Sequence, residues 1–262
     1  MSNPTEGPRA GSVRRYGWVP DVPDHRDVLF SPPPAVMASL PPHADLRAAC
    51  PEIYDQGQLG SCTANAIGAA FEFDQKKQGL ADFMPSRLFI YYNERAIEGT
   101  VDSDSGAMIR DGMKTLNQMG VCPEGEWPYD LAKFRDQPSA QCYADAAKHQ
   151  ALVYRRVLQD LHQLQGGLAS GYPIVFGFSV YESFEGRDVA RGGVVPLPKR
   201  AEKQLGGHAV LAVGYDDTDQ TFWVRNSWGT GWGQRGYCKM PYAYLTSSGL
   251  ASDFWALYTV EG

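Results

Sequence analysis

The chain has 262 residues, of which 43% are hydrophobic and 21% are charged. These are the proportions of a soluble globular protein that is long enough to bury a substantial core. Its 24 basic and 30 acidic residues give a net charge of −6, which argues against nucleic acid or an anionic membrane as the main partner, because both select basic surfaces. No apolar run reaches the length of about 18 residues that a membrane span needs. No secretion signal is recognisable either, so we expect a cytoplasmic protein or one exported by a non-classical route.

Residues 1–39 are rich in proline and lack helical or strand periodicity. We expect this segment to be an extended arm in front of the main domain. Trp18 and Phe30, with Tyr16, are predicted to pin the arm onto that domain, because exposed aromatic side chains in a polar tail cost free energy. The charged run at 24–27 is predicted to be solvated. A flexible tail is the alternative interpretation.

Apolar residues at helical spacing predict helices over 63–78, 86–96, 107–119, 139–148 and 158–169. After these, β-branched and aromatic runs between Gly- and Asp-rich turns predict strands over 174–180, 208–215, 222–225, 236–240 and 254–260. Helices followed by strands indicate an α+β domain over 40–262, with a helical lobe at about 55–170 and a β lobe at about 171–262. A groove between two such lobes is a frequent place for an active site.

Glycines precede Cys62, which opens the first predicted helix. The free N–H groups and the positive dipole end at that position stabilise a thiolate, the nucleophilic form of cysteine. Cys62 is therefore a candidate nucleophile, although a buried packing cysteine is the alternative. His208 follows two glycines at the start of an apolar strand and is a candidate base for a cysteine, with a core histidine as the alternative. Asn226, in the block NSWGTGWG, can orient an imidazole without adding charge; the alternative is a Gly/Trp hairpin.

Together, these blocks resemble the papain family of cysteine peptidases over about residues 40–260, and short bacterial members with such an arm, the xylellain type, are most similar. Cys62 and His208 are 146 positions apart, within the range of about 130–150 that is typical of the family. Asn226 lies 164 positions after Cys62, which an inserted surface loop explains. The matching blocks are Gln56-Gly57 with Gly60-Ser61-Cys62, Gly207-His208-Ala209 with Val213-Gly214-Tyr215, and Asn226-Ser227-Trp228-Gly229 with Trp232-Gly233.

The resemblance implies a two-lobe fold and gives a role to each matched residue. Cys62 would be the nucleophile, paired with His208 as thiolate and imidazolium, and Asn226 would orient His208. Gln56 and the Cys62 backbone N–H would form the oxyanion hole, and Trp228 would cover the pair of His208 and Asn226. The implied activity is that of an endopeptidase working through an acyl-enzyme. Peptide ligation or deamidation at the same site, and an inactive peptide-binding relic, are the alternatives.

By the same resemblance, Gly106 would offer its N–H and C=O to the substrate residue two before the scissile bond, as in strand addition. Met108, Ala209 and Gly177 would line the pocket for that residue's side chain. Asp253 would lie at the bottom of this pocket and broaden its preference towards Arg and Lys, as an acidic residue does in cathepsin B. The stretch before Gly106 is too short for the occluding loop of cathepsin B, which favours an endopeptidase.

The chain also departs from the family pattern. The family has a Cys three residues before the nucleophile and a Trp directly after it. These positions are here Leu59 and Thr63, so the family's first disulfide cannot form.

The long helical propeptide of the family is missing, and we expect residues 1–39 to cover part of the groove instead and to inhibit the enzyme. The expected partners are peptide or protein substrates. No metal or phosphate-loop motif occurs, so no metal and no cofactor are expected. The sequence leaves open how the remaining cysteines pair, namely Cys50, Cys122, Cys142 and Cys238.

Overall fold

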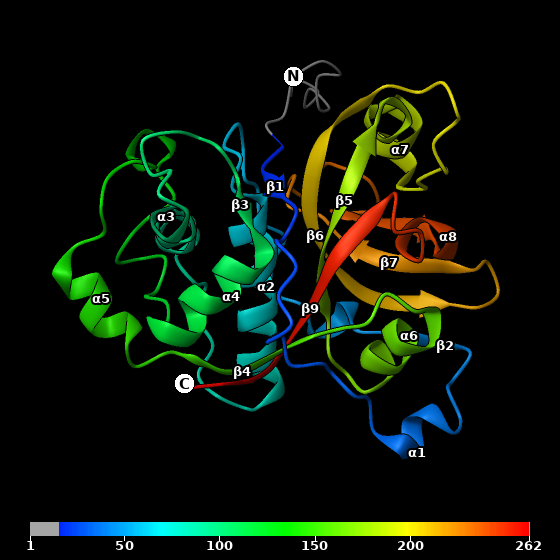
Figure 1. Cartoon of the computed structure of the whole chain (residues 1–262), viewed down its shortest axis with the longest axis horizontal. Coiled ribbons are helices and arrows are strands. Elements are labelled where there is room, and N and C mark those ends of the chain that lie inside the picture. Colours follow the sequence, from blue (N-terminus) through cyan, green and yellow to red (C-terminus); the bar gives the residue numbers. More distant parts are fainter. Residues whose placement is uncertain (1–15, 262) are drawn as a thin grey trace, which may run out of the picture.

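The computed structural model describes residues 16–261 of the chain. Helices gather on one side of the molecule and a β-sheet on the other (Figure 1). The helical side contains α2 (Cys62–Lys77), α3 (Arg87–Glu98), α4 (Ile109–Gln118) and α5 (Ala140–Ala146). The α+β architecture with two lobes that the sequence predicts is therefore confirmed. No helix within residues 16–261 is long and apolar enough to cross a lipid bilayer.

The sheet has seven strands in the order β4-β9-β5-β6-β7-β8, and β2 pairs with β6 beside this path. Its pairings are all antiparallel. The strands are β2 (His43–Asp45), β4 (Ala151–Arg156), β5 (Ile174–Tyr181), β6 (Gln204–Asp216), β7 (Thr221–Arg225), β8 (Tyr237–Pro241) and β9 (Ala251–Val260). Shorter helical elements are α1 (Pro34–Met37), α6 (Leu161–Ala169), α7 (Arg187–Gly192) and α8 (Tyr242–Leu245), with 3-10 turns at Arg47–Ala49, Leu131–Lys133 and Glu182–Glu185.

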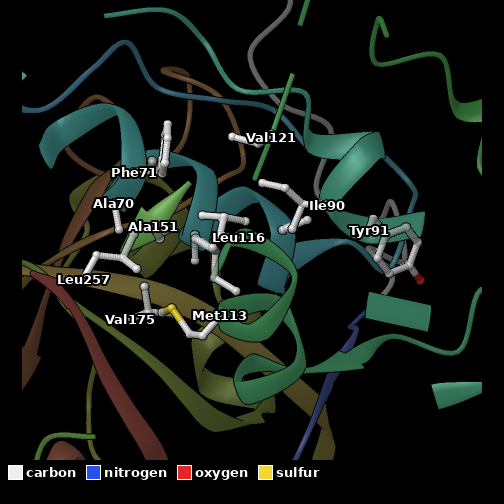
Figure 2. Close-up of a cluster of buried hydrophobic side chains, with 14 of the residues drawn as sticks. Ala70, Phe71, Ile90, Tyr91, Met113, Leu116, Val121, Ala151, Val175 and Leu257 are labelled. Carbon is white, nitrogen blue, oxygen red and sulfur yellow. The ribbon is translucent and has the colours of Figure 1, made fainter. Parts of the chain in front are cut away.

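Helix α2 lies between the two lobes and packs against α3 and α4 on one side and against β6 and β9 on the other. Its apolar spacing predicts one inward face, but 14 of its 16 residues are buried. Alanines and a glycine fill much of its surface, which lets both lobes approach its backbone closely. Figure 2 shows the core at this junction, where Met113 of α4 lies beside Val175 of β5. Phe71 of α2, Leu116 of α4 and Leu257 of β9 belong to the same cluster.

The boundary between the lobes differs from the prediction. Residues 151–156, expected in the helical lobe, form β4 and pair with β9, and α6 packs on β2 and β6, where Leu164 and Leu168 join the core of the β lobe. The sheet side therefore begins about 20 residues before position 171. Strand β4 is half-exposed along most of its length, so it lacks the regular apolar alternation by which strands are recognised.

The arm is ordered over residues 16–39 and runs between the lobes before it crosses the lower part of the sheet (Figure 1). Its first strand, β1 (Trp18–Val19), pairs in parallel with β3 (Ala107–Met108). The predicted helix at 107–119 consequently begins only at Ile109. Phe30 is 3% exposed and packs edge-on against Tyr172 and Tyr258. A flexible tail is therefore wrong for residues 16–39, while the rest of the arm, 1–15, lies outside the described residues.

The charged run at 24–27 is only partly solvated, in contrast to the prediction. Arg26 is exposed and pairs with its neighbour Asp24. Asp27, in contrast, turns inward and forms ion pairs with Arg110 at 2.5 Å and with Arg156 at 3.0 Å. Hydrogen-bonded ion pairs of this kind are how a protein buries charge at acceptable cost. They tie the middle of the arm to both lobes.

Candidate active site

Cys62 is the first residue of α2 and is completely buried. The backbone N–H groups of Ala209 and Gly17 both reach its sulfur. Ala209 directly follows His208 on β6, so the sulfur lies against the strand that carries the candidate base. Burial raises the pKa of the Cys62 thiol to about 12 and outweighs these hydrogen bonds. With the arm in place, burial therefore disfavours the thiolate form of Cys62.

His208 is held in one orientation by Asn226, whose Oδ1 lies 2.8 Å from His208 Nε2. The same Oδ1 also accepts a hydrogen bond from the Ser227 backbone N–H at 2.8 Å. Because the amide oxygen can only accept, Nε2 must carry the proton in this contact. The other ring nitrogen, Nδ1, is then the one that can exchange a proton with a thiol. Both side chains are almost fully buried, which protects the contact from competing water.

Trp228 lies over the imidazole, with ring centroids 4.9 Å apart and planes inclined by 30°. Trp232 and Phe184 pack edge-on around Trp228 at 5.3 and 5.5 Å. Trp228 is 3% exposed, and it thus covers His208 as the resemblance implies. Gly229, next in the chain, has φ = +72°, a conformation that glycine adopts without strain and that lets the loop turn directly after the tryptophan.

Gln56 is fully buried beside the start of α2. Its Nε2 donates to the Leu59 carbonyl at 2.9 Å, and its Oε1 accepts from the Ser227 hydroxyl at 2.7 Å. The Ser227 contact links the loop before Cys62 to the loop after Asn226. Tyr129 supports the same place from outside, because its hydroxyl donates to the Gln56 carbonyl at 3.0 Å and contacts the Ser61 hydroxyl. The sequence analysis did not identify Tyr129 or Ser227 as supports.

Gly17 places the arm directly at the nucleophile. A methyl group on Gly17 would lie 1.6 Å from the Gly60 carbonyl oxygen, so only glycine fits. The Gly17 carbonyl accepts a hydrogen bond from the Ala107 N–H at 2.8 Å, and its N–H faces the Cys62 sulfur. Tyr16 continues over His208, with ring centroids 6.2 Å apart. The arm therefore occupies the position where a substrate would meet the sulfur.

The arm is bound one residue beyond Gly106, the glycine that is predicted to contact the substrate. Gly106 has φ = +76°, and its N–H donates to the Tyr91 hydroxyl at 3.2 Å. It is the N–H of the next residue, Ala107, that binds the extended chain in the groove. The sequence offered no signal for this shift, because it depends on the left-handed turn at Gly106.

Trp18 fills the predicted side-chain pocket. Its indole lies on Gly177, where a methyl group would come within 1.9 Å of the ring. Gly177 pairs with Ala209 across the sheet, and Met108 is opposite Val19 in the pairing of the arm with β3. Of the residues predicted for this pocket, Gly177 and Asp253 contact Trp18 directly, while Ala209 and Met108 lie on the neighbouring strands.

Asp253 is 3% exposed and accepts hydrogen bonds from Trp18 Nε1 at 3.2 Å and from the Asp21 N–H at 2.8 Å. Its other oxygen pairs with Arg156 at 3.3 Å. Asp21 lies beside it, bound by the Arg110 N–H and by Trp255 Nε1. Burial and the neighbouring Asp253 raise the pKa of Asp21 to about 6. The sequence analysis missed Asp21 and Arg156, which join the pocket from distant parts of the chain.

Thr63 stands where the family has tryptophan and donates its hydroxyl to Glu94 at 2.8 Å. Glu94 is completely buried, and burial raises the pKa of its carboxyl well above the usual value. Beneath Cys62 there is therefore a buried carboxyl group whose charged form is disfavoured, instead of an indole. Among the described residues, one group of at least three side chains could hold a metal ion, namely Cys122, Glu126 and Cys142, and none of its members belongs to the site described above.

A family model described as papain family cysteine protease matches residues 40–257. An uncharacterised peptidase C1-like protein of Acanthamoeba polyphaga mimivirus is 45% identical over 94% of this chain and 88% of its own length. Digestive cysteine proteinase 1 of Homarus americanus is 28% identical over 79% of this chain and 63% of that protein.

Among solved structures, xylellain, a cysteine protease from Xylella fastidiosa, has 46% identity and a TM-score of 0.88, and the match covers 99% of this chain and all of the other. Procathepsin L 3 of Tenebrio molitor has 19% identity and a TM-score of 0.69 over 89% of this chain and 75% of the other, which shows a shared fold.

Proposed function

Since the chain belongs to the papain family of cysteine proteases, we propose that it hydrolyses internal peptide bonds with Cys62 as nucleophile. This proposal rests on the way the structure brings two parts of the chain together. Cys62, at the start of α2, lies against the strand that carries His208. Asn226 Oδ1 lies 2.8 Å from His208 Nε2 and so fixes the orientation of the imidazole ring. A cysteine, an imidazole and a residue that orients the imidazole are the parts that nucleophilic catalysis of acyl transfer requires.

In this reaction the Cys62 sulfur attacks the scissile carbonyl carbon, after its proton has moved to His208 Nδ1. Negative charge develops on the carbonyl oxygen and is stabilised by the Gln56 side-chain amide and the Cys62 backbone N–H, as expected for an oxyanion hole. The imidazolium then protonates the leaving amine, and a thioester remains on Cys62. Water, deprotonated by His208, attacks the thioester and releases the carboxylic acid.

We further propose that residues 16–39 inhibit this activity by occupying the groove. Trp18 fills the side-chain pocket, and Gly17 lies on the sulfur. The arm is a poor substrate because of its orientation: the Gly17 N–H faces the sulfur, while its carbonyl is bonded to Ala107. A thiol attacks a carbonyl carbon and not an amide nitrogen, so Gly17 presents no electrophile to Cys62.

The pocket around Trp18 supports a substrate preference two residues before the cut. It holds an indole and ends in a buried carboxylate, so it suits large side chains that carry a hydrogen-bond donor or a positive charge. Arg and Lys match both features, and they would pair with Asp253 in an environment where charge-assisted hydrogen bonds are strong.

The proposal is tested by mapping fragments of peptide libraries after incubation with the chain and with Gly17→Ala, using Cys62→Ala as the blank. Internal cuts that depend on Cys62 support an endopeptidase. Ligated products would show that the site performs peptide ligation instead. Conversion of glutamine to glutamate without cleavage would show that it performs deamidation instead. No reaction, together with no labelling of Cys62 by iodoacetamide, would indicate an inactive peptide-binding protein.

A further inference from the structure

Two cysteines that the proposed chemistry does not use lie together in the helical lobe. The Sγ atoms of Cys122 and Cys142 and a carboxylate oxygen of Glu126 all lie within 4.8 Å of one another. Both cysteines are free thiols in this structure and are at most 2% exposed, whereas Glu126 is exposed. The pair therefore lies about one side chain below the surface.

We propose that Cys122 and Cys142 are a disulfide-forming pair that is oxidised by a small disulfide such as oxidised glutathione. Their backbones are already fixed. The Cys122 carbonyl accepts from the Ser86 N–H at 2.9 Å, and Cys142 lies in α5, where its N–H is capped by the Ser139 hydroxyl at 3.3 Å. The sulfur of Cys142 contacts the Ser139 hydroxyl, the Glu126 carbonyl and the side chain of Cys122, and all of these contacts are exchangeable. Side-chain rotation can bring two such sulfurs to the bond length of about 2.05 Å.

The reaction proceeds by two exchanges. One cysteine thiolate attacks oxidised glutathione, forms a mixed disulfide and displaces one glutathione thiolate. The second cysteine thiolate then attacks the protein sulfur of that mixed disulfide and displaces the second glutathione. Two protons leave the cysteines, and glutathione takes up the two electrons. Burial, Cys142 and Glu126 raise the pKa of the Cys122 thiol far above its usual value, so the exchange quickens as the pH rises.

A metal ion is the competing use of this cluster, and the geometry favours the disulfide. Closed structural zinc sites have four protein ligands. Here the described residues supply three, and one of them, Glu126, is at the surface. A disulfide needs only the two thiols, and these are the two enclosed members of the group.

The bond would close the base of a segment that supports the active site. The 20-residue span from Cys122 to Cys142 carries Tyr129, whose hydroxyl contacts Ser61 and donates to the Gln56 carbonyl. It also carries Phe134, whose carbonyl accepts a hydrogen bond from Arg95. Closing a loop of this length reduces the freedom of the unfolded chain, so oxidation stabilises the lobe that holds Gln56 and Cys62.

The test uses the full chain with Cys62→Ala, which removes the candidate nucleophile and leaves four of the five cysteines. The protein is equilibrated with reduced and oxidised glutathione over a range of ratios at pH 8. Thiols are then counted after acid quenching and denaturation, and peptides are mapped by mass spectrometry without reduction. We expect the count to fall from four to two, with one peptide pair, containing Cys122 and Cys142, lighter by two hydrogens. The midpoint of thermal unfolding should rise by about 5–10 °C.

Matched variants decide the assignment. Cys50→Ser changes a partly buried thiol elsewhere, so on oxidation this variant should still lose two thiols and gain thermal stability. On oxidation Cys142→Ser should lose no pair of thiols and gain no thermal stability. If Cys142→Ser does not fold, Cys122→Ala and Cys142→Ala replace it. A thiol count that stays at four at every glutathione ratio overturns the proposal, and so does a link between other cysteines. Stoichiometric zinc that copurifies with the chain and blocks oxidation until a chelator removes it would assign the cluster to a metal instead. None of these measurements depends on peptidase activity.

Discussion

The carbonyl oxygen of Gly17 accepts a 2.8 Å hydrogen bond from the N–H of Ala107, and this contact orients the arm at the nucleophile. The carbonyl carbon is turned to the wall of the groove while the N–H of the same glycine faces the sulfur. If the proposed function holds, this orientation lets the arm rest on the Cys62 sulfur without being cut. Most of the predictions below depend on this relationship.

Gly17→Ala should activate the chain. The added methyl group would lie 1.6 Å from the Gly60 carbonyl oxygen, and the overpacking is expected to cost about 1–3 kcal/mol. This corresponds to a roughly 5–150-fold weaker docking of the arm. Initial rates on a short fluorogenic peptide should rise accordingly. Gly125→Ala is the matched control, because no atom lies within 4 Å of its added carbon. Equal rates for Gly17→Ala and Gly125→Ala would contradict inhibition by the arm.

Docking of the arm should weaken as the pH rises. The pKa of Asp21 is raised from 3.8 to about 6 by burial and by Asp253, so the docked arm binds this proton more tightly than a free arm does. Docking is then strongest below about pH 4 and loses this contribution as the pH rises through 6. The equilibrium constant for docking of the arm should fall by roughly ten- to a hundredfold over this range.

The measurement is the activity of the unchanged chain divided by that of Gly17→Ala at each pH, since this ratio cancels the pH dependence of catalysis itself. It should rise between pH 4 and pH 7. In Asp21→Asn, which cannot ionise, the ratio should stay flat over the same range. A ratio that falls with pH would contradict control of the arm by Asp21.

Asp253→Asn should reduce the preference for a basic residue two positions before the cut. The comparison is made in Gly17→Ala, so that the arm does not compete. Asp253 has φ = +57°, a conformation that asparagine tolerates better than alanine. Loss of the charge should lower the ratio of kcat/KM for Arg over Phe at this position by about tenfold or more. An unchanged ratio would reject Asp253 as the base of the pocket.

Gln56→Ala should slow hydrolysis without removing the nucleophile. One oxyanion donor is worth about 10²–10³ in kcat, whereas alkylation of a thiol by iodoacetamide develops no oxyanion. In Gly17→Ala, the additional change should therefore lower kcat by that factor and leave the rate of Cys62 labelling nearly unchanged. Ser227→Ala removes the hydroxyl that binds Gln56 Oε1 but keeps the donor, so a much smaller loss is expected. A parallel loss of hydrolysis and labelling would indicate a general disturbance of α2.

The candidate catalytic residues can be picked out from the sequence because each lies in a short local pattern. Cys62 opens a helix, His208 lies in an apolar strand, and Asn226 precedes a Gly/Trp loop. The structure supplies what ties them together, namely the buried bridge between Gln56 and Ser227 and the indole stacked over the imidazole. The resemblance to a known family already anticipated their joint roles.

The path of the arm was not predictable in the same way. It depends on the space left by Gly60 and Gly177 and on hydrogen bonds between residues more than 200 positions apart, such as Asp21 and Asp253. Local periodicity carries no information on such pairings. For the same reason β4 was assigned to the wrong lobe, since its partner β9 comes about 100 residues later.

The protonation state of Cys62 also depends on the fold. A helix start favours the thiolate, but enclosure by both lobes and the arm raises the pKa of this thiol to about 12. We therefore expect Cys62 to be masked while the arm is docked and to become reactive when the arm leaves.

Alkylation of Cys62 by iodoacetamide at pH 6, followed by peptide mapping, tests this claim most directly. We predict fast labelling of one thiol, Cys62, in Gly17→Ala, slow labelling in the unchanged chain, and slow labelling again when His208→Ala is added to Gly17→Ala. Equally slow labelling in Gly17→Ala and in its His208→Ala derivative would contradict the account, because it would mean that the sulfur and the imidazole do not act together.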